Sequence, residues 1–197
     1  MARRPDLERF SREHGIKIGT IADLIAYRLE KERNVERIAE QVVETAYGEF
    51  TLYCYDDQVS QTVHVALAKG DLPSAQDPLV RVHIQDTLGD ALGIKSPALG
   101  WPIDSAIERI SQEEAGVVVV LREQESSREL MEVVEGLSRG HDELHNRRSG
   151  DAVLRTYGIG AQILRDLEIQ KMRVLSAPKQ MYGISGFDLE VTGYVED

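Results

Sequence analysis

The chain has 197 residues, of which 42% are hydrophobic and 29% are charged, and this balance predicts one globular domain, or one domain with an appendage. Its 34 acidic and 23 basic residues leave a net charge of −11, which argues against a broad nucleic-acid surface because such surfaces neutralise phosphates with Lys and Arg. The single cysteine excludes an internal disulfide and a multi-cysteine zinc site. The absence of a long apolar run or apolar leader predicts a cytoplasmic protein without membrane contact.

Residues 1–34 are predicted to form two helices. The first opens at Pro5 and ends at Gly15, and the second begins at Thr20. The second helix carries an apolar stripe at helical spacing, surrounded by charged side chains on a solvated face. A segment of this size cannot form a domain alone, so the stripe must pack on the rest of the chain or on a neighbour. The stripe consists of Ile21, Leu24, Ile25 and Leu29.

The chain changes character at about residue 35. Apolar residues on both sides of the turn-like Tyr47-Gly48 predict a β-hairpin over about 42–54. Further along, apolar runs alternate with helical patterns. Antiparallel strands first and βαβ-like alternation afterwards predict an α+β fold with a mixed sheet. The later strands are expected at 63–67, 79–84, 117–121, 172–175 and 189–195, and the helices at about 103–114, 130–137 and 151–167.

Several motifs match one family in order and spacing. They are Tyr47-Gly48-Glu49-Phe50, His64-Val65-Ala66-Leu67 with Gly70-Asp71, Arg81-Val82-His83, Leu88-Gly89-Asp90, and the block Tyr157-Gly158-Ile159-Gly160-Ala161-Gln162-Ile163-Leu164. Over residues 36–197 they closely resemble GTP cyclohydrolase II, the enzyme that starts riboflavin biosynthesis. The resemblance implies a GTP cyclohydrolase II-like fold, and we assign residues 35–197 to such a domain.

The front of the chain carries a second resemblance. Residues 1–7 and 14–28 look like the last segment of 3,4-dihydroxy-2-butanone 4-phosphate synthase, which many bacteria fuse ahead of GTP cyclohydrolase II. We therefore interpret residues 1–34 as the C-terminal remnant of a synthase domain. Because the other catalytic residues of the synthase lie upstream of this segment, synthase activity is expected to be absent from this chain.

In the cyclohydrolase II family, three cysteines hold a zinc ion that activates water for attack on the purine ring. The chemistry needs the ion because it lowers the pKa of bound water to about 7. Here the resemblance places Asp86, Pro97 and Leu99 at the cysteine positions. Proline and leucine offer no side-chain ligand, and Cys54 lies in the hairpin, where a core role is expected. The sequence therefore predicts no zinc site and no other cofactor.

Other elements of the family pattern are altered as well. A Gln-Glu-Gly-Arg segment is replaced by residues 123–127, which lack the arginine, and residues 136–150 hold no match for a catalytic tyrosine. Val153 replaces an aspartate base, and valine cannot move a proton. Arg155 retains the position of the family's arginine nucleophile, but we expect it to be insufficient for catalysis alone. Ser176 keeps a hydroxyl at a substrate-binding position.

Three further features have two interpretations each. Arg81 begins a nucleotide-contacting block of the family, so it either binds phosphate or is a strand-end arginine paired with a neighbouring acid, and we favour the second. His141 and His145, with Glu143 between them, would share one helix face and suit a replacement metal site. We favour exposed histidines in a polar loop. Structural roles, rather than ligand binding, are expected for His14, His64, His83, Gly158 and Gly160.

Three functions remain open. The first is a degenerate domain that has lost its zinc site and activity and serves the fused synthase as a structural, interaction or regulatory module. The second is a GTP cyclohydrolase II that still acts on GTP with an altered site, and the third is a domain that binds GTP or a related nucleotide without turnover. We favour the first, because removing a zinc-activated water costs many powers of ten in rate. Both parent enzymes are homodimers, so a homodimer is expected.

Overall fold

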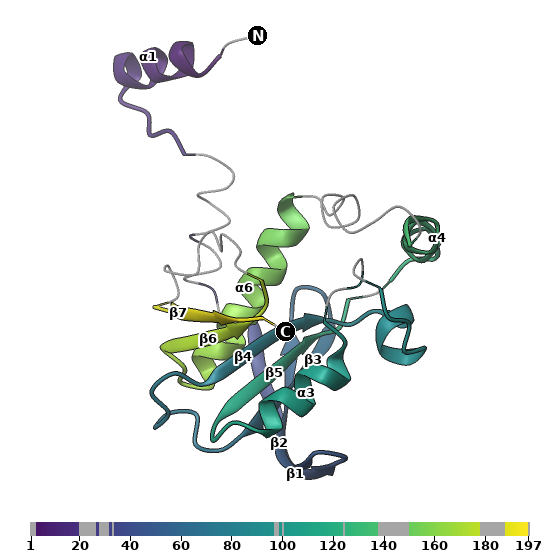
Figure 1. The fold of residues 1–197 in the computed structure, drawn as a ribbon. Coiled ribbons are helices and arrows are strands. Elements are labelled where there is room, and N and C mark those ends of the chain that lie inside the picture. The colour runs from purple at the N-terminus through teal and green to yellow at the C-terminus, as the bar shows by residue number, and fades with distance from the viewer. Residues whose placement is uncertain are drawn as a thin grey trace.

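The computed structural model describes residues 3–19, 27, 32, 34–96, 99, 101–123, 125–137, 150–177 and 188–196, with the backbone alone for 150–155 and 157. Its centre is a seven-stranded sheet in the order β1-β2-β3-β5-β4-β6-β7 (Figure 1). The β1-β2-β3-β5 pairs are antiparallel, and the β5-β4-β6-β7 pairs are parallel. The strands are β1 (Val35–Thr45), β2 (Gly48–Asp57), β3 (Thr62–Lys69), β4 (Leu79–Ile84), β5 (Gly116–Leu121), β6 (Lys171–Leu175) and β7 (Glu190–Val195).

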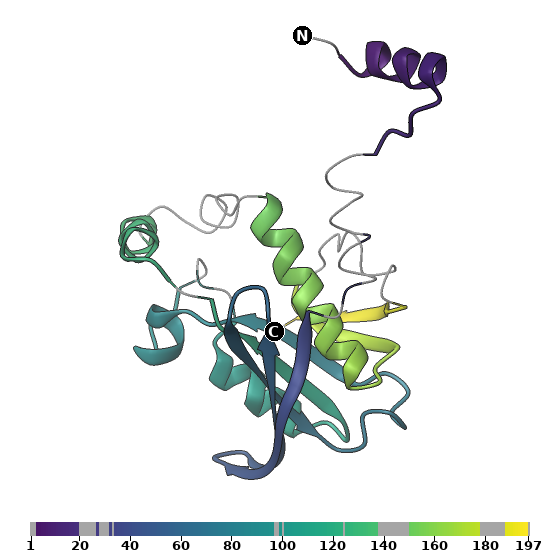
Figure 2. The same ribbon diagram turned by 180° about the vertical axis from the view of Figure 1, so that it is seen from behind.

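Two helices cover opposite faces of the sheet, α3 (Ile103–Ser111) on one and α6 (Gly150–Asp166) on the other (Figures 1 and 2). Successive residues of β5 face these two layers in turn. Val117 and Val119 belong to the core cluster that contains the α6 side chains, whereas Val118 and Val120 belong to the cluster that contains the α3 side chains. All residues of β5 are buried, as expected for a central strand covered on both faces.

The predicted α+β fold, with antiparallel strands first and βαβ-like alternation afterwards, is confirmed. The connection from β4 to β5 runs through α3, and the connection from β5 to β6 runs through α6 on the other face, so that β4 lies between β5 and β6. The connections that follow the neighbouring strands β4 and β5 therefore run over opposite faces of the sheet. In open sheets, ligand crevices form at such switch points, beyond the carboxyl ends of the strands.

The helix α6 approaches β4 closely at Gly160. A Cβ atom at this position would lie 3.2 Å from Cγ1 of Val82, which is tighter than ordinary van der Waals contact between carbon atoms. The missing side chain therefore lets the helix backbone rest on the strand. This contact agrees with the helix-packing role predicted for Gly160.

The helix α1 (Arg4–His14) ends as predicted at Gly15, which has a φ of 63° and donates its N–H to the Ser11 carbonyl. No residue of α1 is buried, and the helix stands apart from the sheet (Figure 1). Its apolar residues Leu7 and Phe10 are about half exposed. The helix predicted from Thr20, with its apolar stripe, lies outside the described residues.

Two details differ from the sequence-based expectation. The helix predicted over 103–114 ends at Ser111, because the chain must turn to bring Gly116 against β4, where a Cβ would lie 2.7 Å from the Leu79 carbonyl oxygen. Cys54 is half-buried rather than part of a core cluster, because the neighbouring strand β1 is largely exposed. Among the described helices, including α4 (Ser127–Gly136), none is long and apolar enough to cross a membrane.

Candidate functional site

A hollow of about 620 Å³ lies at the switch point, between the segments that follow β4 and β5 and the start of β3. Its walls are mostly polar, because they come from loops and from the beginning of α4 rather than from the sheet. The side chains that matter for its chemistry are Gln85, Thr87, Arg122, Glu123, Glu125 and Ser126.

Two hydrogen bonds hold the acidic side chains of this crevice. Thr87 Oγ1 donates to Glu125 Oε2 at 2.5 Å and so links the segment after β4 to the segment after β5. Thr156 Oγ1, on α6, donates to Glu123 Oε1 at 2.8 Å. Both glutamates belong to the stretch that replaces the arginine-containing segment of the family. Their two negative charges outweigh the single positive charge of Arg122 in the lining, which disfavours a polyphosphate here.

The segment after β4 forms a short π-helical turn, η1 (Thr87–Ala91). Asp86 precedes the turn, and its Oδ1 accepts the N–H of Gly89 at 2.6 Å. The N–H of Asp86 donates to Asp90 Oδ2 at 3.0 Å. The Nε2 of His83, a buried residue of β4, donates to the Asp90 carboxylate, with distances of 2.8 and 2.9 Å to its two oxygens. The donor atoms of these three side chains lie within 4.8 Å of one another.

Arg81 lies two residues before His83 and reaches the end of β6. Its Nη1 donates to the carbonyl oxygen of Leu175 at 2.9 Å, and in the described part of the chain its buried Nε has no hydrogen-bond partner. Burial lowers the pKa of Arg81, and the charge of Asp90 opposes that shift. Among the described residues Arg81 forms no ion pair with an acid; its hydrogen bond goes to the backbone, and Asp90 acts on it through its charge alone.

The structure describes the remaining predicted site residues only in part. Ser176 directly follows Leu175 and is buried, with its hydroxyl donating to the Ala177 carbonyl at 2.8 Å. The structure therefore brings Arg81 and Ser176 to one strand end. The backbone of Arg155 lies in α6, and its side chain is not described. Leu99 is half-buried, whereas Pro97, His141 and His145 lie outside the described residues.

The histidines that the structure describes each contact other residues of the chain. His64 is buried, and its Nδ1 accepts the N–H of Arg122 at 3.1 Å. His14 is exposed at the end of α1, with its ring centroid 4.3 Å from that of Phe10. The sequence analysis did not predict the contact from His83 to Asp90. The capping role of Asp86 could have been predicted, because an aspartate three residues before Gly89 has the spacing of an N-cap.

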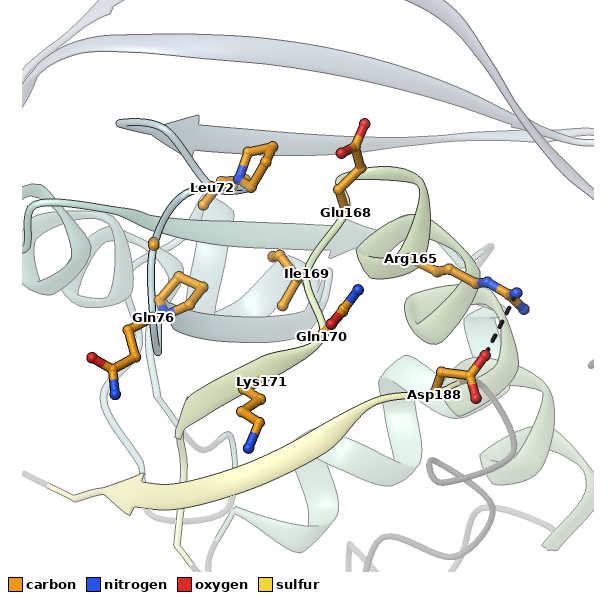
Figure 3. A pocket seen from close by; sticks show the side chains of 11 residues that line it. Leu72, Gln76, Arg165, Glu168, Ile169, Gln170, Lys171 and Asp188 are labelled. Carbon is orange, nitrogen blue, oxygen red and sulfur yellow. Dashed lines mark ion pairs between the residues drawn. The ribbon is translucent and has the colours of Figure 1, made fainter.

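A second hollow, of about 500 Å³, lies at the opposite edge of the sheet (Figure 3). It is bounded by the loop around Gln76, the end of α6 and the start of β6. Arg165 and Asp188 form an ion pair of 3.6 Å at its rim, and Lys171 pairs with Glu190 at 3.1 Å. It shares no lining residue with the first hollow, so the two are distinct. Of the predicted site residues whose side chains the structure describes, Arg81, Asp86, Leu99 and Ser176, none lines either hollow, although Asp86 lies between Gln85 and Thr87 of the first.

Comparison with known proteins decides the family. The GTP cyclohydrolase II family model matches residues 36–196. The chain belongs to the GTP cyclohydrolase II family. The chain is 45% identical over 193 residues to a 3,4-dihydroxy-2-butanone 4-phosphate synthase of Pseudomonas syringae pv. tomato, covering 97% of this chain and 52% of that protein. It is 38% identical over 203 residues to the riboflavin biosynthesis protein RibBA of Salinispora arenicola, covering 100% of this chain and 48% of the relative.

A solved structure is also similar to this member of the GTP cyclohydrolase II family. It is the crystal structure of RibBX, a two-domain 3,4-dihydroxy-2-butanone 4-phosphate synthase from A. baumannii, with a TM-score of 0.69 and 36% sequence identity. The match covers 100% of this chain and 51% of that one. The chain thus spans about half the length of the relatives that it matches.

Proposed function

We propose that this GTP cyclohydrolase II-like domain has lost its zinc site and its catalytic activity and serves a riboflavin-biosynthesis protein as a structural, interaction or regulatory module. In this proposal the module belongs with a 3,4-dihydroxy-2-butanone 4-phosphate synthase, the activity named for several relatives of about twice its length. The protein is proposed to be cytoplasmic and to form a homodimer.

The observation that carries the proposal is the state of the zinc-ligand positions. One carboxylate oxygen of Asp86 accepts a hydrogen bond from the Gly89 amide, and Leu99 has only a hydrocarbon side chain. The residues present therefore do not reproduce the family's three-thiolate zinc site, and no reaction step is assigned to a metal here. The acidic side chains in the crevice, Glu123 and Glu125, further oppose binding of a nucleoside triphosphate.

The test is an assay of formate and pyrophosphate release from GTP, with the purified chain and with zinc added in excess. We expect no release above the rate without enzyme, because no thiolate-held ion is available to activate water. Added zinc ensures that a negative result does not reflect metal lost in purification. Zinc-dependent turnover that disappears in Arg155→Ala would overturn the proposal and establish an altered cyclohydrolase.

Binding of GTP without turnover is the other candidate, and one observation favours it: the buried Nε of Arg81 lacks a partner among the described residues. Calorimetric titration with GTP separates the two. The proposed module should give no heat of binding at sub-millimolar GTP. Binding that is lost in Arg81→Gln but kept in Arg128→Gln, a change at an exposed arginine of α4, would identify a nucleotide-binding domain instead.

A further inference from the structure

The loop after β4 occupies the position at which the family resemblance places the first zinc cysteine. In this chain that position holds Asp86, and its two polar groups both have partners within the loop. The carboxylate accepts the Gly89 N–H at 2.6 Å, and the backbone N–H donates to Asp90 at 3.0 Å. A side chain on Gly89 would be crowded, since a Cβ there would lie 3.0 Å from Asp86 Oδ2. Asp86 is therefore a capping residue that closes the turn.

His83 joins this loop to the sheet. Its side chain is 3% exposed, and the Asp90 carboxylate that it contacts is 11% exposed. Asp90 thus accepts one hydrogen bond from a buried side chain of β4 and one from the loop backbone at Asp86. Hydrogen bonds to a carboxylate are roughly twice as strong as neutral ones, and water has little access to compete for these.

The same three side chains offer one nitrogen and two carboxylates within 4.8 Å, so a metal is the competing explanation. Ligation through the Nε2 atom of His83, which faces Asp90, would require the proton that it donates to Asp90 to leave. It would also compete with the Gly89 amide for Asp86 and with the Asp86 amide for Asp90. The observed contacts satisfy Nε2 and both carboxylates through protons, whereas the buried Nδ1 of His83 has no partner among the described residues.

We propose that Asp86, at the position of the first zinc cysteine, takes over from zinc in fixing the turn after β4, and that it does so together with His83 and Asp90, which belong to motifs shared with the family. The loop keeps its conformation through a histidine–carboxylate contact and two backbone caps, and the fold is independent of metal. The proposal goes beyond the loss of catalysis, because it states what holds this segment in place. This proposal can fail while the formate assay remains negative. Its failure is therefore distinguishable from failure of the proposed loss of catalysis.

The network predicts which backbone amides are protected from hydrogen exchange in the full chain. The amides of Asp86 and Gly89 should both be protected, because each donates to a carboxylate. Asp90→Ala should speed exchange of the Asp86 amide by at least about tenfold, and Asp86→Ala should do the same for the Gly89 amide. Asp188→Asn is the matched control, because Asp188 is exposed and has a φ of 58°, which asparagine tolerates. The control should change neither amide.

The same experiment can overturn the proposal. If the Asp86 and Gly89 amides exchange at unprotected rates in the unaltered chain, or if the alanine variants leave them as protected as the control does, the network does not hold the loop. Because exchange is read residue by residue in native protein, a general loss of stability would speed all amides together and would be recognised. A variant that does not fold is replaced by Asp86→Asn or Asp90→Asn, which test the same two amides.

Metal dependence is the second arm. The purified chain should contain well under one equivalent of metal, and neither chelator nor added Zn²⁺ should move its melting temperature by more than about 1 °C, because nothing in the loop requires an ion. About one bound Zn²⁺ per chain, lost together with chelator sensitivity in Asp86→Asn or His83→Gln, would show that the three side chains form a metal site and would refute the replacement.

Discussion

At the scale of single residues, Glu113 is the acid with the clearest electrostatic role. It accepts a hydrogen bond from Arg173 at 2.8 Å and pairs with Arg109 at 2.7 Å. The hydrogen bond from Arg173, with that from Arg109, lowers the pKa of Glu113 below its ordinary value of 4.5, against the effect of burial. Its contribution to stability is therefore complete above that value and is lost as the pH falls through the lower, folded-state pKa.

Glu113→Gln should consequently destabilise the domain at neutral pH by about 1 kcal/mol, since the pair is partly exposed and two arginines are left facing each other. The difference from the unaltered chain should shrink as the pH falls from 5 toward 3. Urea unfolding across this pH range measures it, with Glu49→Gln at an exposed strand position as the control. A difference that stays constant down to pH 3 would contradict the assignment.

The Gly160 contact makes a second prediction about a single residue. Gly160→Ala places a methyl group 3.2 Å from Val82, so α6 or β4 must shift, and we expect a loss of about 1 kcal/mol despite the better helix propensity of alanine. Val82→Ala removes the opposing methyl groups. The double variant should therefore lose less stability than the sum of the two single changes, a non-additivity that urea unfolding detects. Simple additivity would show that the two residues do not contact.

At the scale of elements, Arg37 is the charged side chain that attaches β1 to the helical layer. At the start of the strand, Val35 packs on the core and the Asn34 N–H donates to Gln162 of α6 at 3.0 Å. Among the described strands β1 pairs with β2 alone, and it is largely exposed. Arg37, on β1, lies 4.6 Å from the ring centre of Tyr53 and pairs with Asp166 of α6 at 2.7 Å. Tyr55 donates its hydroxyl to the same carboxylate at 3.0 Å. Arg37 thus connects the edge of the sheet to the end of α6.

Arg37→Ala should lower the free energy of unfolding by about 1–2 kcal/mol, the sum expected for a partly exposed ion pair and a cation–π contact. Hydrogen exchange should increase in β1 more than in β5. Arg37→Lys keeps the charge but not the planar group that stacks on tyrosine, so its effect should be intermediate. An Arg37→Ala variant as stable as the unaltered chain, with unchanged exchange in β1, would show that β1 needs no such connection.

The elements differ in how far the sequence predicts them. The apolar run of β5 is buried on both faces, so its pattern is unambiguous, and β4 was predicted with the observed bounds. β1 begins at Val35, well before the predicted hairpin, because exposure of both faces leaves its residues without the alternation that marks a strand. The sequence-based prediction contains no turn at η1, because one of the contacts that shape it comes from His83 on β4, although the Asp86 cap on Gly89 is local.

At the scale of the whole molecule, the sheet order determines what the candidate site contains. The sequence identifies Arg81 and Ser176 through their motifs, yet only the adjacency of β4 and β6 brings the Arg81 guanidinium to the carbonyl before Ser176. The crevice between the ends of β4 and β5 likewise joins Thr87 to Glu125, which are 38 residues apart. Such pairings depend on long-range topology, which residue patterns do not encode.

The last prediction concerns assembly and residues 1–34. No residue of α1 is buried, and Leu7 and Phe10 expose about half of their surface. Exposed apolar residues on a helix that stands apart from the sheet need a partner, and a self-complementary two-fold interface is the commonest one. We expect the full chain to be a homodimer at micromolar concentration and a version beginning at Val35 to be monomeric or less stable. Light scattering and thermal unfolding of both versions decide this. If both are monomeric and equally stable, the first 34 residues serve neither dimerisation nor docking onto this domain, and their partner would be the part of the longer relatives that this chain does not match.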